Sequence, residues 1–508
     1  MKKFVEKHQR KIAGTISTFD RIIFKGYLPF RFPEAVEHFL YRNGLLIKDF
    51  KAFAKKQSEQ IKQHAIDYAK KQNRPYQYLN EKIRKEQLAR QIAEDDGIDQ
   101  GLICVFSVLE QNPSYSLRYG ENRPHLIRCR PRCLTVYFYF MDRQLGFMHV
   151  RLQSWLPFMI QVYVNGHEWL AKRLKQKDIK YDKLENAFVR IQDCTKAQKI
   201  ADQFCKRRWE KLLAVFARRV NPLMNGILKG MEYYWVTDQA EYATDIMFEG
   251  PGELRSLYTK LQRHATVCFS AEDVLTFLGR KLSGHFRGEV ENDYKRRLPG
   301  ARIKHRMKAN CIKMYDKFGS VLRVETVVNH PYEFKIRRRA KRRGKTVMGW
   351  FPMAKRVTNL YRYAEVSMAA NCQYLDALSV VDDPSASIRM LDKLCAPAQL
   401  NGHRKRAMNP VSCDDVKLFA AVMRGEHFIH GFRNGHLAEH LGISLSENKP
   451  ERRRQSSRIG RLLQLLRAHR LIAKIPRSRR YRVTLRGFKV MTAAVFLREE
   501  FMPEHIYA

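Results

Sequence analysis

Two periods of hydrophobic residues divide the first 380 positions of the chain into strands and helices. The segment 14–28 is rich in β-branched and aromatic residues, which is typical of a β-strand. Between residues 33 and 95, apolar residues recur at helical spacing, and Pro33 followed by Glu34 is a typical helix start. We therefore expect a strand followed by a long helical region.

The following region alternates between the same two patterns, which predicts an α+β fold. Segments 101–109 and 133–140 are strand-like, and 146–153 continues as the second arm of a hairpin. Pro, Asp, Asn and Gly later dominate a stretch that is typical of a linker. We further expect helix over 167–235 and 352–380 and a second hairpin over 311–328. The chain is therefore expected to divide into a core at 1–381, a linker at 382–411 and a C-terminal domain at 412–508.

The C-terminal domain has the clearest pattern of elements. Ser412 is a typical N-cap for a helix that carries Val416 and Phe419 on one face. Gly442 is a good C-terminal cap for a short helix before it. The sequence then predicts a loop over 445–455, an amphipathic helix over 456–470, two strands around a basic tip at 476–480, and a closing helix over 485–497.

This order of elements resembles a winged helix, in particular its MarR-like branch. The resemblance lies in Leu-Ile-Ala-Lys-Ile from Leu471 and in Arg-Tyr-Arg-Val-Thr-x-x-Gly from Arg480. It implies a helix in the DNA major groove and a wing on the backbone or in the minor groove. The alternative is a winged helix that contacts another protein.

Charge favours DNA, because residues 451–490 hold fourteen Lys and Arg against one acid, Glu451. The candidate DNA-binding residues of this domain are Arg452, Arg453, Arg454, Ser457, Arg458, Arg461, Arg477, Arg479, Arg480 and Arg482.

The whole chain is strongly basic, with a formal charge of +44 over 508 residues. Such an excess repels itself and calls for a polyanionic partner, for which nucleic acid is the common choice. DNA is the expected partner and structured RNA the alternative, and the oligomeric state stays open, with a homodimer among the options. Two basic stretches of the core are expected to contact phosphates, through Lys304, Arg306, Lys308, Arg337, Arg338, Arg339, Lys341, Arg342 and Arg343.

Several protein classes are disfavoured by the same composition. No run of 18 apolar residues occurs, so we expect no membrane partner, and the basic N-terminus is not followed by the apolar segment of a secretory signal. The ten cysteines lack a zinc or disulfide framework; the closest pair is Cys129 and Cys133. We expect reduced thiols and a cytoplasmic, nucleoid-associated protein.

The core lacks the common catalytic motifs, including Walker glycines, GxSxG and HExxH. Its best candidate is the segment 311–328, CIKMYDKFGSVLRVETVV, which resembles the nicking hairpin of rolling-circle plasmid replication initiators. The resemblance implies a nucleophilic Tyr315, with Lys317 or Arg323 stabilising the oxyanion. It also implies that Glu325 and Asp20 hold a divalent cation. The alternative is an ordinary structural hairpin.

A second acidic cluster consists of Asp238, Glu241 and Asp245, which share one face if the segment is helical. In a basic protein, clustered carboxylates suggest Mg²⁺ or Mn²⁺ bound together with a phosphate substrate. The alternative is helix capping with local salt bridges. A third group, Glu289, Glu291 and Asp293, is expected to pair with the cations at 295–297.

The chain as a whole resembles uncharacterised bacterial proteins associated with mobile elements. The resemblance is carried by FDRIIFKG, GFMHVRLQSWLPF, IKMYDK with VLRVET, and the terminal winged-helix pattern. The first hypothesis is a site-specific DNA-nicking or strand-transfer protein, similar to transposases or replication initiators. The others are a non-enzymatic DNA-binding regulator and a binding protein for structured RNA, and the sequence leaves open whether the core is catalytic.

Overall fold

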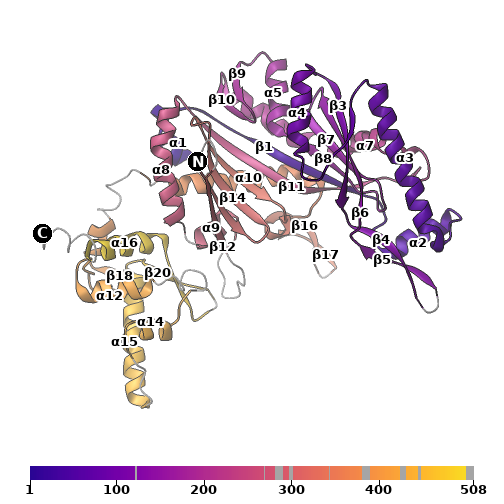
Figure 1. Ribbon diagram of the computed structural model, residues 1–508. Coiled ribbons are helices and arrows are strands. Elements are labelled where there is room, and N and C mark those ends of the chain that lie inside the picture. The colour runs from indigo at the N-terminus through magenta and orange to yellow at the C-terminus, as the bar shows by residue number, and fades with distance from the viewer. Residues whose placement is uncertain are drawn as a thin grey trace. The chain divides into compact units, whose positions relative to one another are not determined.

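The fold is mixed α and β, as predicted, with a large mixed sheet (Figure 1). The chain divides into two compact units: unit 1 holds Met1–Ile12, Phe248–Thr326 and Ala369–Ala508, and unit 2 holds Ala13–Met247 and Val327–Met368. The computed structural model describes residues 1–120, 123–267, 269, 271–280, 290–296, 301–342, 344–379, 381, 390–423, 431–443, 448–476 and 478–498.

Unit 2 is built on seven neighbouring strands of the large sheet. Their order is β11 (Tyr234–Phe248), β1 (Ile12–Tyr27), β8 (Ile160–Val164), β7 (Gly146–Gln153), β6 (Arg132–Asp142), β3 (Gly101–Gln111) and β2 (Tyr76–Tyr78). β2 runs parallel to β3, and the pairs β1–β8, β8–β7, β7–β6 and β6–β3 are antiparallel. Three further hairpins are β4–β5 (Ser114–Tyr119, Pro124–Cys129), β9–β10 (Tyr181–Leu184, Ala187–Ile191) and β16–β17 (Lys335–Arg342, Lys345–Pro352).

The predicted long helix over 33–95 is in fact three helices. Gly44 and Asn73 adopt positive φ angles of 68° and 51°, which a continuing right-handed helix does not allow. Ala89 and Ala93 bring the third helix onto β3. The helices of unit 2 are α2 (Pro33–Arg42), α3 (Phe50–Lys71), α4 (Lys85–Asp95), α5 (Gly166–Gln176), α6 (Cys194–Ala201) and α7 (Trp209–Val220).

Unit 1 contributes four strands of the large sheet and the C-terminal domain. The strands are β12 (Val290–Arg296), β13 (Ala301–Met307), β14 (Asn310–Lys317) and β15 (Val321–Val328), and the last two residues of β15 belong to unit 2. The predicted hairpin over 311–328 is therefore confirmed as β14–β15. The helices outside the C-terminal domain are α1 (Lys2–Lys7), α8 (Pro251–Val267), α9 (Ala271–Phe277) and α10 (Leu360–Leu378), which starts in unit 2.

The C-terminal domain has the predicted order of helix, short helix, long helix, hairpin and helix. The long helix starts earlier than predicted, at residue 449, inside the segment 445–455 that was expected to be a loop. Pro450 in the first turn and Glu451 beside it are both typical of a helix start. The elements are β18–β19 (Ala398–Leu400, His403–Lys405), α12 (Cys413–Val422), α14 (Asn434–His440), α15 (Lys449–Ala468), β20 (Ile472–Lys474), β21 (Tyr481–Val483) and α16 (Leu485–Phe496).

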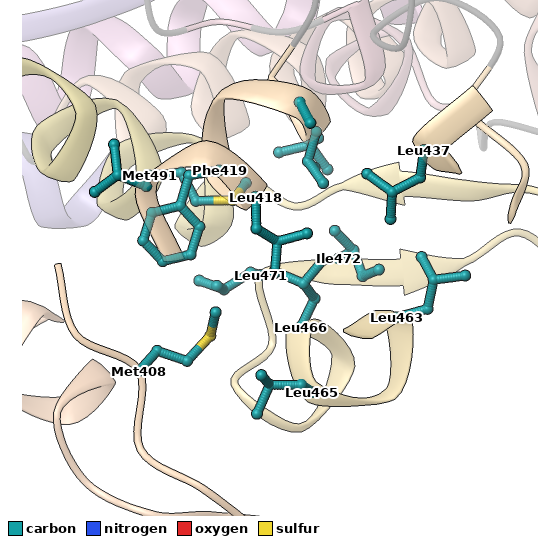
Figure 2. Packing of buried hydrophobic residues seen from close by; sticks show 14 of the residues in the cluster. Met408, Leu418, Phe419, Leu437, Leu463, Leu465, Leu466, Leu471, Ile472 and Met491 are labelled. Atoms are coloured by element: carbon teal, nitrogen blue, oxygen red, sulfur yellow. The ribbon is translucent and has the colours of Figure 1, made fainter. Parts of the chain in front are cut away.

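One hydrophobic core joins these C-terminal elements. Leu463 and Leu466 of α15 lie in the same cluster as Phe419 of α12 and Leu437 of α14 (Figure 2). Ile459 of the same helix is also fully buried, and Leu462 is partly buried. Because the exposed face of α15 keeps its arginines in water, the helix is amphipathic as predicted.

A buried carboxylate fixes the start of α12. Asp415 is 2% exposed and accepts hydrogen bonds from Arg406 Nη1 at 2.9 Å and from the Asn409 amide at 2.8 Å. Burial would raise the pKa of Asp415, but the hydrogen bonds from Arg406 and Asn409 outweigh it and hold the pKa below its usual value. Arg406, in the expected linker, thereby anchors the domain.

We predict that Asp415→Asn destabilises the C-terminal domain by about 1.5–3 kcal/mol at neutral pH, since charged hydrogen bonds contribute on that order. The depressed pKa means that this stabilisation is full above the unfolded-state pKa, about 3.9, and is lost as the pH falls through the folded-state value. Hydrogen exchange of α12 measures the effect. Asp414→Asn, at the exposed neighbouring position, should leave exchange unchanged at pH 7; equal effects of the two variants would contradict the role of Asp415.

Candidate functional site

A buried histidine lies between two carboxylates in unit 2. Nδ1 of His167, in the first turn of α5, lies 3.2 Å from Oδ1 of Asp20 on β1. Its Nε2 forms a hydrogen bond of 3.3 Å with Oδ2 of Asp245 on β11. Asn186 Nδ2 also donates to Asp20 Oδ1, at 2.8 Å. The carboxylate of Asp20 is therefore oriented by two side chains from distant parts of the sequence.

The start of α5 explains how His167 reaches this position. The side chain of Asn165 caps the helix by accepting from the amides of His167 and Glu168, at 2.8 and 3.1 Å. A Cβ at Gly166 would lie 2.3 Å from the backbone oxygen of Phe19, so only glycine lets the helix start approach β1 this closely. Sequence reasoning missed His167, although the Asn-Gly pair before it is a recognisable helix-start signal.

The acidic cluster at 238–245 lies on a strand, so the prediction of one helical face was wrong. β11 is rich in Thr, Tyr, Trp and Val, which favour a pleated strand. Side chains alternate along a strand, so Glu241 and Asp245 share one face, and Asp238 lies on the other. Asp238 pairs with Lys355 Nζ at 2.9 Å. The structure thus separates Asp238 from the two acids with which the sequence grouped it.

Three of the predicted metal ligands come together. Asp20, Glu241 and Glu325 each offer one carboxylate oxygen, and these oxygens lie within 4.8 Å of one another. All three side chains are buried, with exposures of 8%, 8% and 1%.

The three carboxylates of this cluster could hold a divalent cation. Two carboxylates at this separation repel each other by about 3 kcal/mol at an effective dielectric constant of about 20. Buried oxygen ligands of this type suit Mg²⁺ or Mn²⁺. Gln239 Nε2 donates to Glu241 Oε1 at 2.6 Å, and His167 and Asn186 contact Asp20. Such outer contacts hold metal ligands in position.

The hairpin β14–β15 places the predicted nucleophile against one of these carboxylates. Tyr315 Oη donates a hydrogen bond of 2.7 Å to Glu325 Oε2, and Lys313 Nζ lies 3.6 Å from Glu325 Oε1. Arg323 is fully buried and shares a face of β15 with Glu325. Lys317 is half-buried, and its ammonium group lies over the Phe318 ring at 5.4 Å.

One predicted phosphate-binding stretch forms an exposed basic hairpin. Arg337, Arg339 and Lys341 alternate along one face of β16 and are exposed, whereas Arg338 lies 5.5 Å from the Phe351 ring. Trp350 stands opposite Arg337 and is 69% exposed. This face therefore combines cations with an exposed aromatic ring. Arg343 and the side chain of Arg342 lie outside the described residues.

The other predicted stretch, on β13, is partly neutralised. Lys304 stands opposite Asp293 on β12, and Arg306 Nε lies 3.8 Å from Glu291 Oε2. Asp293 also accepts from Arg302 Nη2 at 2.9 Å. The partners that the described residues show for Glu291 and Asp293 thus lie across the strand pair on β13, whereas the predicted pairing with the cations at 295–297 falls partly on the side chain of Arg296, which lies outside the described residues. Lys308 is exposed; Glu289 and Arg297 lie outside the described residues.

The basic residues of the C-terminal domain occupy α15 and the β20–β21 hairpin. Arg482 is half-buried and pairs with Glu272, and Arg477 lies outside the described residues. Arg479 is exposed and Arg480 is half-buried. The side chains of α15 expected to contact DNA are all exposed, namely Arg452, Arg453, Arg454, Ser457, Arg458 and Arg461.

No protein-family model, no curated protein and no solved structure matches this sequence. Within the part of the chain that the structure describes, no helix combines the length and apolar character that crossing a membrane requires.

Proposed function

We propose that this chain is a metal-dependent DNA-nicking and strand-transfer protein of a mobile element. The observation that carries the proposal is the approach of Asp20, Glu241 and Glu325 to within 4.8 Å in a chain of charge +44. Buried acids are costly in isolation but are the expected ligands where a cation and a phosphate meet. A bound Mg²⁺ or Mn²⁺ would supply charge neutralisation for the phosphodiester.

The C-terminal domain would deliver the DNA. Its element order is that of a winged helix, and the exposed face of α15 carries five arginines, at 452, 453, 454, 458 and 461. Such a helix fits the major groove, and the β20–β21 hairpin would lie on the adjacent backbone. In this proposal the C-terminal domain selects duplex DNA, and the acidic centre formed by Asp20, Glu241 and Glu325 acts on one strand.

Tyr315 is the proposed nucleophile. Its oxygen would attack the phosphorus while its proton passes to Glu325 Oε2, which already accepts its hydrogen bond at 2.7 Å. The bond from phosphorus to the leaving deoxyribose oxygen breaks, and that oxygen takes a proton from water. The phosphotyrosyl link conserves the phosphodiester energy, so that a second deoxyribose hydroxyl can reverse the step and join a new strand.

The test is incubation of the full chain with supercoiled DNA from its own locus, with and without Mn²⁺. We expect Mn²⁺-dependent nicking and a covalent protein–DNA adduct that survives denaturation. Tyr315→Phe should lose the adduct and at least about a hundredfold in nicking rate, or about 2.7 kcal/mol of barrier. Tyr294→Phe, at a 50% exposed tyrosine in unit 1, is the matched control and should behave as wild type.

Each of the other outcomes would indicate a different function for this chain. Nicking that persists in Tyr315→Phe means that water, not tyrosine, is the nucleophile. Duplex binding without nicking in every metal condition indicates a DNA-binding regulator. Co-purifying RNA that survives ~0.5 M salt indicates an RNA-binding protein, since purely phosphate-driven binding weakens steeply with salt.

A further inference from the structure

A basic cavity lies in unit 2 at the end of β1. Its volume is about 500 Å³, within the range of small-ligand pockets. The segment from residue 25 to 31 forms one side, and the hairpin β4–β5 forms the other. None of the predicted site residues lines this cavity.

The cavity is held open by specific hydrogen bonds. Tyr115 Oη donates to the Phe30 backbone oxygen at 2.6 Å, and Arg128 Nη2 donates to the Arg31 backbone oxygen at 3.1 Å. Ser114 Oγ donates to the Leu156 oxygen at 2.7 Å, which fixes the start of β4. The walls are therefore built before any ligand arrives, which lowers the entropy lost on binding.

The charge of the lining is entirely positive. Lys25, Arg31, Arg128 and Arg130 line the cavity, and none of its thirteen lining residues, all in the described part of the chain, is acidic. The three arginines are exposed, whereas Lys25 is half-buried. Burial lowers the pKa of Lys25, and Asp238 only partly offsets this, so an anion in the cavity would stabilise the charged ammonium.

Aromatic rings accompany the cations. Tyr27 lines the cavity and is 36% exposed, and the Lys25 ammonium lies 5.5 Å from its ring. Phe32, just outside the lining, is 52% exposed, and the Arg128 guanidinium lies 5.3 Å from its ring. Cations beside exposed rings are the combination that binds an unpaired nucleotide, because the base stacks and the phosphate is neutralised.

We propose that this cavity binds one unpaired nucleotide of a DNA single strand, with the base against Tyr27 and the phosphate at the arginines. The inference rests on the proposed function and deepens it, because a nicked strand must leave its duplex, and so expose unpaired nucleotides, before it is joined to another strand. The cavity would bind the strand, and its lining includes none of the three carboxylates of the acidic centre.

The test measures binding of labelled dT12 to the full chain in EDTA, where no cleavage occurs. Arg128→Ala/Arg130→Ala should weaken binding at least tenfold and reduce the slope of log affinity against log salt by about 0.7, the value for one phosphate contact in a single strand. The control Arg190→Ala/Arg218→Ala removes the same charge from exposed positions of unit 2 and should change neither. Equal weakening by the two pairs would overturn the site.

Further variants separate binding from folding. Arg130→Glu keeps the Arg128 hydrogen bond and should still weaken dT12 binding, and photo-crosslinking of 5-iodouracil in the strand should label Tyr27. Labelling elsewhere only, U12 bound as tightly as dT12, or thymidine monophosphate bound as tightly as the strand would each overturn the assignment. Because EDTA removes catalysis, loss of nicking with normal dT12 binding contradicts only the proposed function.

Discussion

Glu241→Gln is expected to lower the affinity of the chain for Mn²⁺ by at least about a hundredfold, or about 2.7 kcal/mol. Glutamine keeps the shape of the side chain and an oxygen that can accept from Gln239, but it removes the charge of one of three converging ligands. Calorimetric titration of the metal-free protein with Mn²⁺ measures the change. Nicking should fall by at least the same factor, because the cation is expected to neutralise the phosphodiester.

The matched control for this variant is Asp238→Asn. Asp238 lies on the same strand but on the opposite face, where it pairs with Lys355. It should leave Mn²⁺ affinity unchanged, whereas a shared loss in both variants would mean that overall charge, not the triad, attracts the metal.

The melting temperature of the metal-free Glu241→Gln variant tests independently whether the three carboxylates repel one another. If the three carboxylates repel one another in the metal-free chain, removing one charge should raise the melting temperature. If cationic side chains already neutralise them, Glu241→Gln leaves a buried cation undercompensated and lowers it. A lower melting temperature together with unchanged Mn²⁺ affinity would mean that Asp20, Glu241 and Glu325 form a structural ion network and not a metal site.

The sequence was most informative where the pattern of residues within one segment is enough to predict that segment's structure. The period of apolar residues along α15 predicts both a helix and its buried face, because Ile459, Leu463 and Leu466 follow one another at helical spacing. The β14–β15 hairpin is likewise a local pattern. These predictions need no knowledge of what packs against the segment.

The candidate site combines residues that local patterns cannot group. Residues 238–245 contain acids at offsets that suit a helix face, but the strand formed there has a period of two, so the same residues divide differently. The contacts of His167 with Asp20 and Asp245 join residues that are 147 and 78 positions away (167 − 20 and 245 − 167). Only the sheet and the start of α5 bring them together, and no periodicity encodes that.

The final glycine of the Thr-x-x-Gly motif explains why this run can close the C-terminal domain. Thr484 Oγ1 accepts from the Gly487 amide at 2.9 Å and donates to the Arg470 oxygen at 2.7 Å, which sets α16 against the end of α15. A Cβ at Gly487 would lie 1.9 Å from the Leu471 backbone oxygen and 2.6 Å from its carbonyl carbon. Both contacts are with backbone, so no side-chain rotation relieves them.

Gly487→Ala should therefore destabilise the domain by about 3 kcal/mol or more, at the upper end of overpacking effects. Hydrogen exchange in the full chain should show faster exchange in α16 and β20, and duplex DNA binding should weaken because α15 shares their core. Gly460→Ala is the matched control, since nothing lies within 4 Å of its added Cβ inside α15. It should slow exchange, as alanine favours a helix over glycine by roughly 0.5–1 kcal/mol. If exchange is slower in both variants, α16 does not approach Leu471 as closely as described, and glycine is not required at position 487.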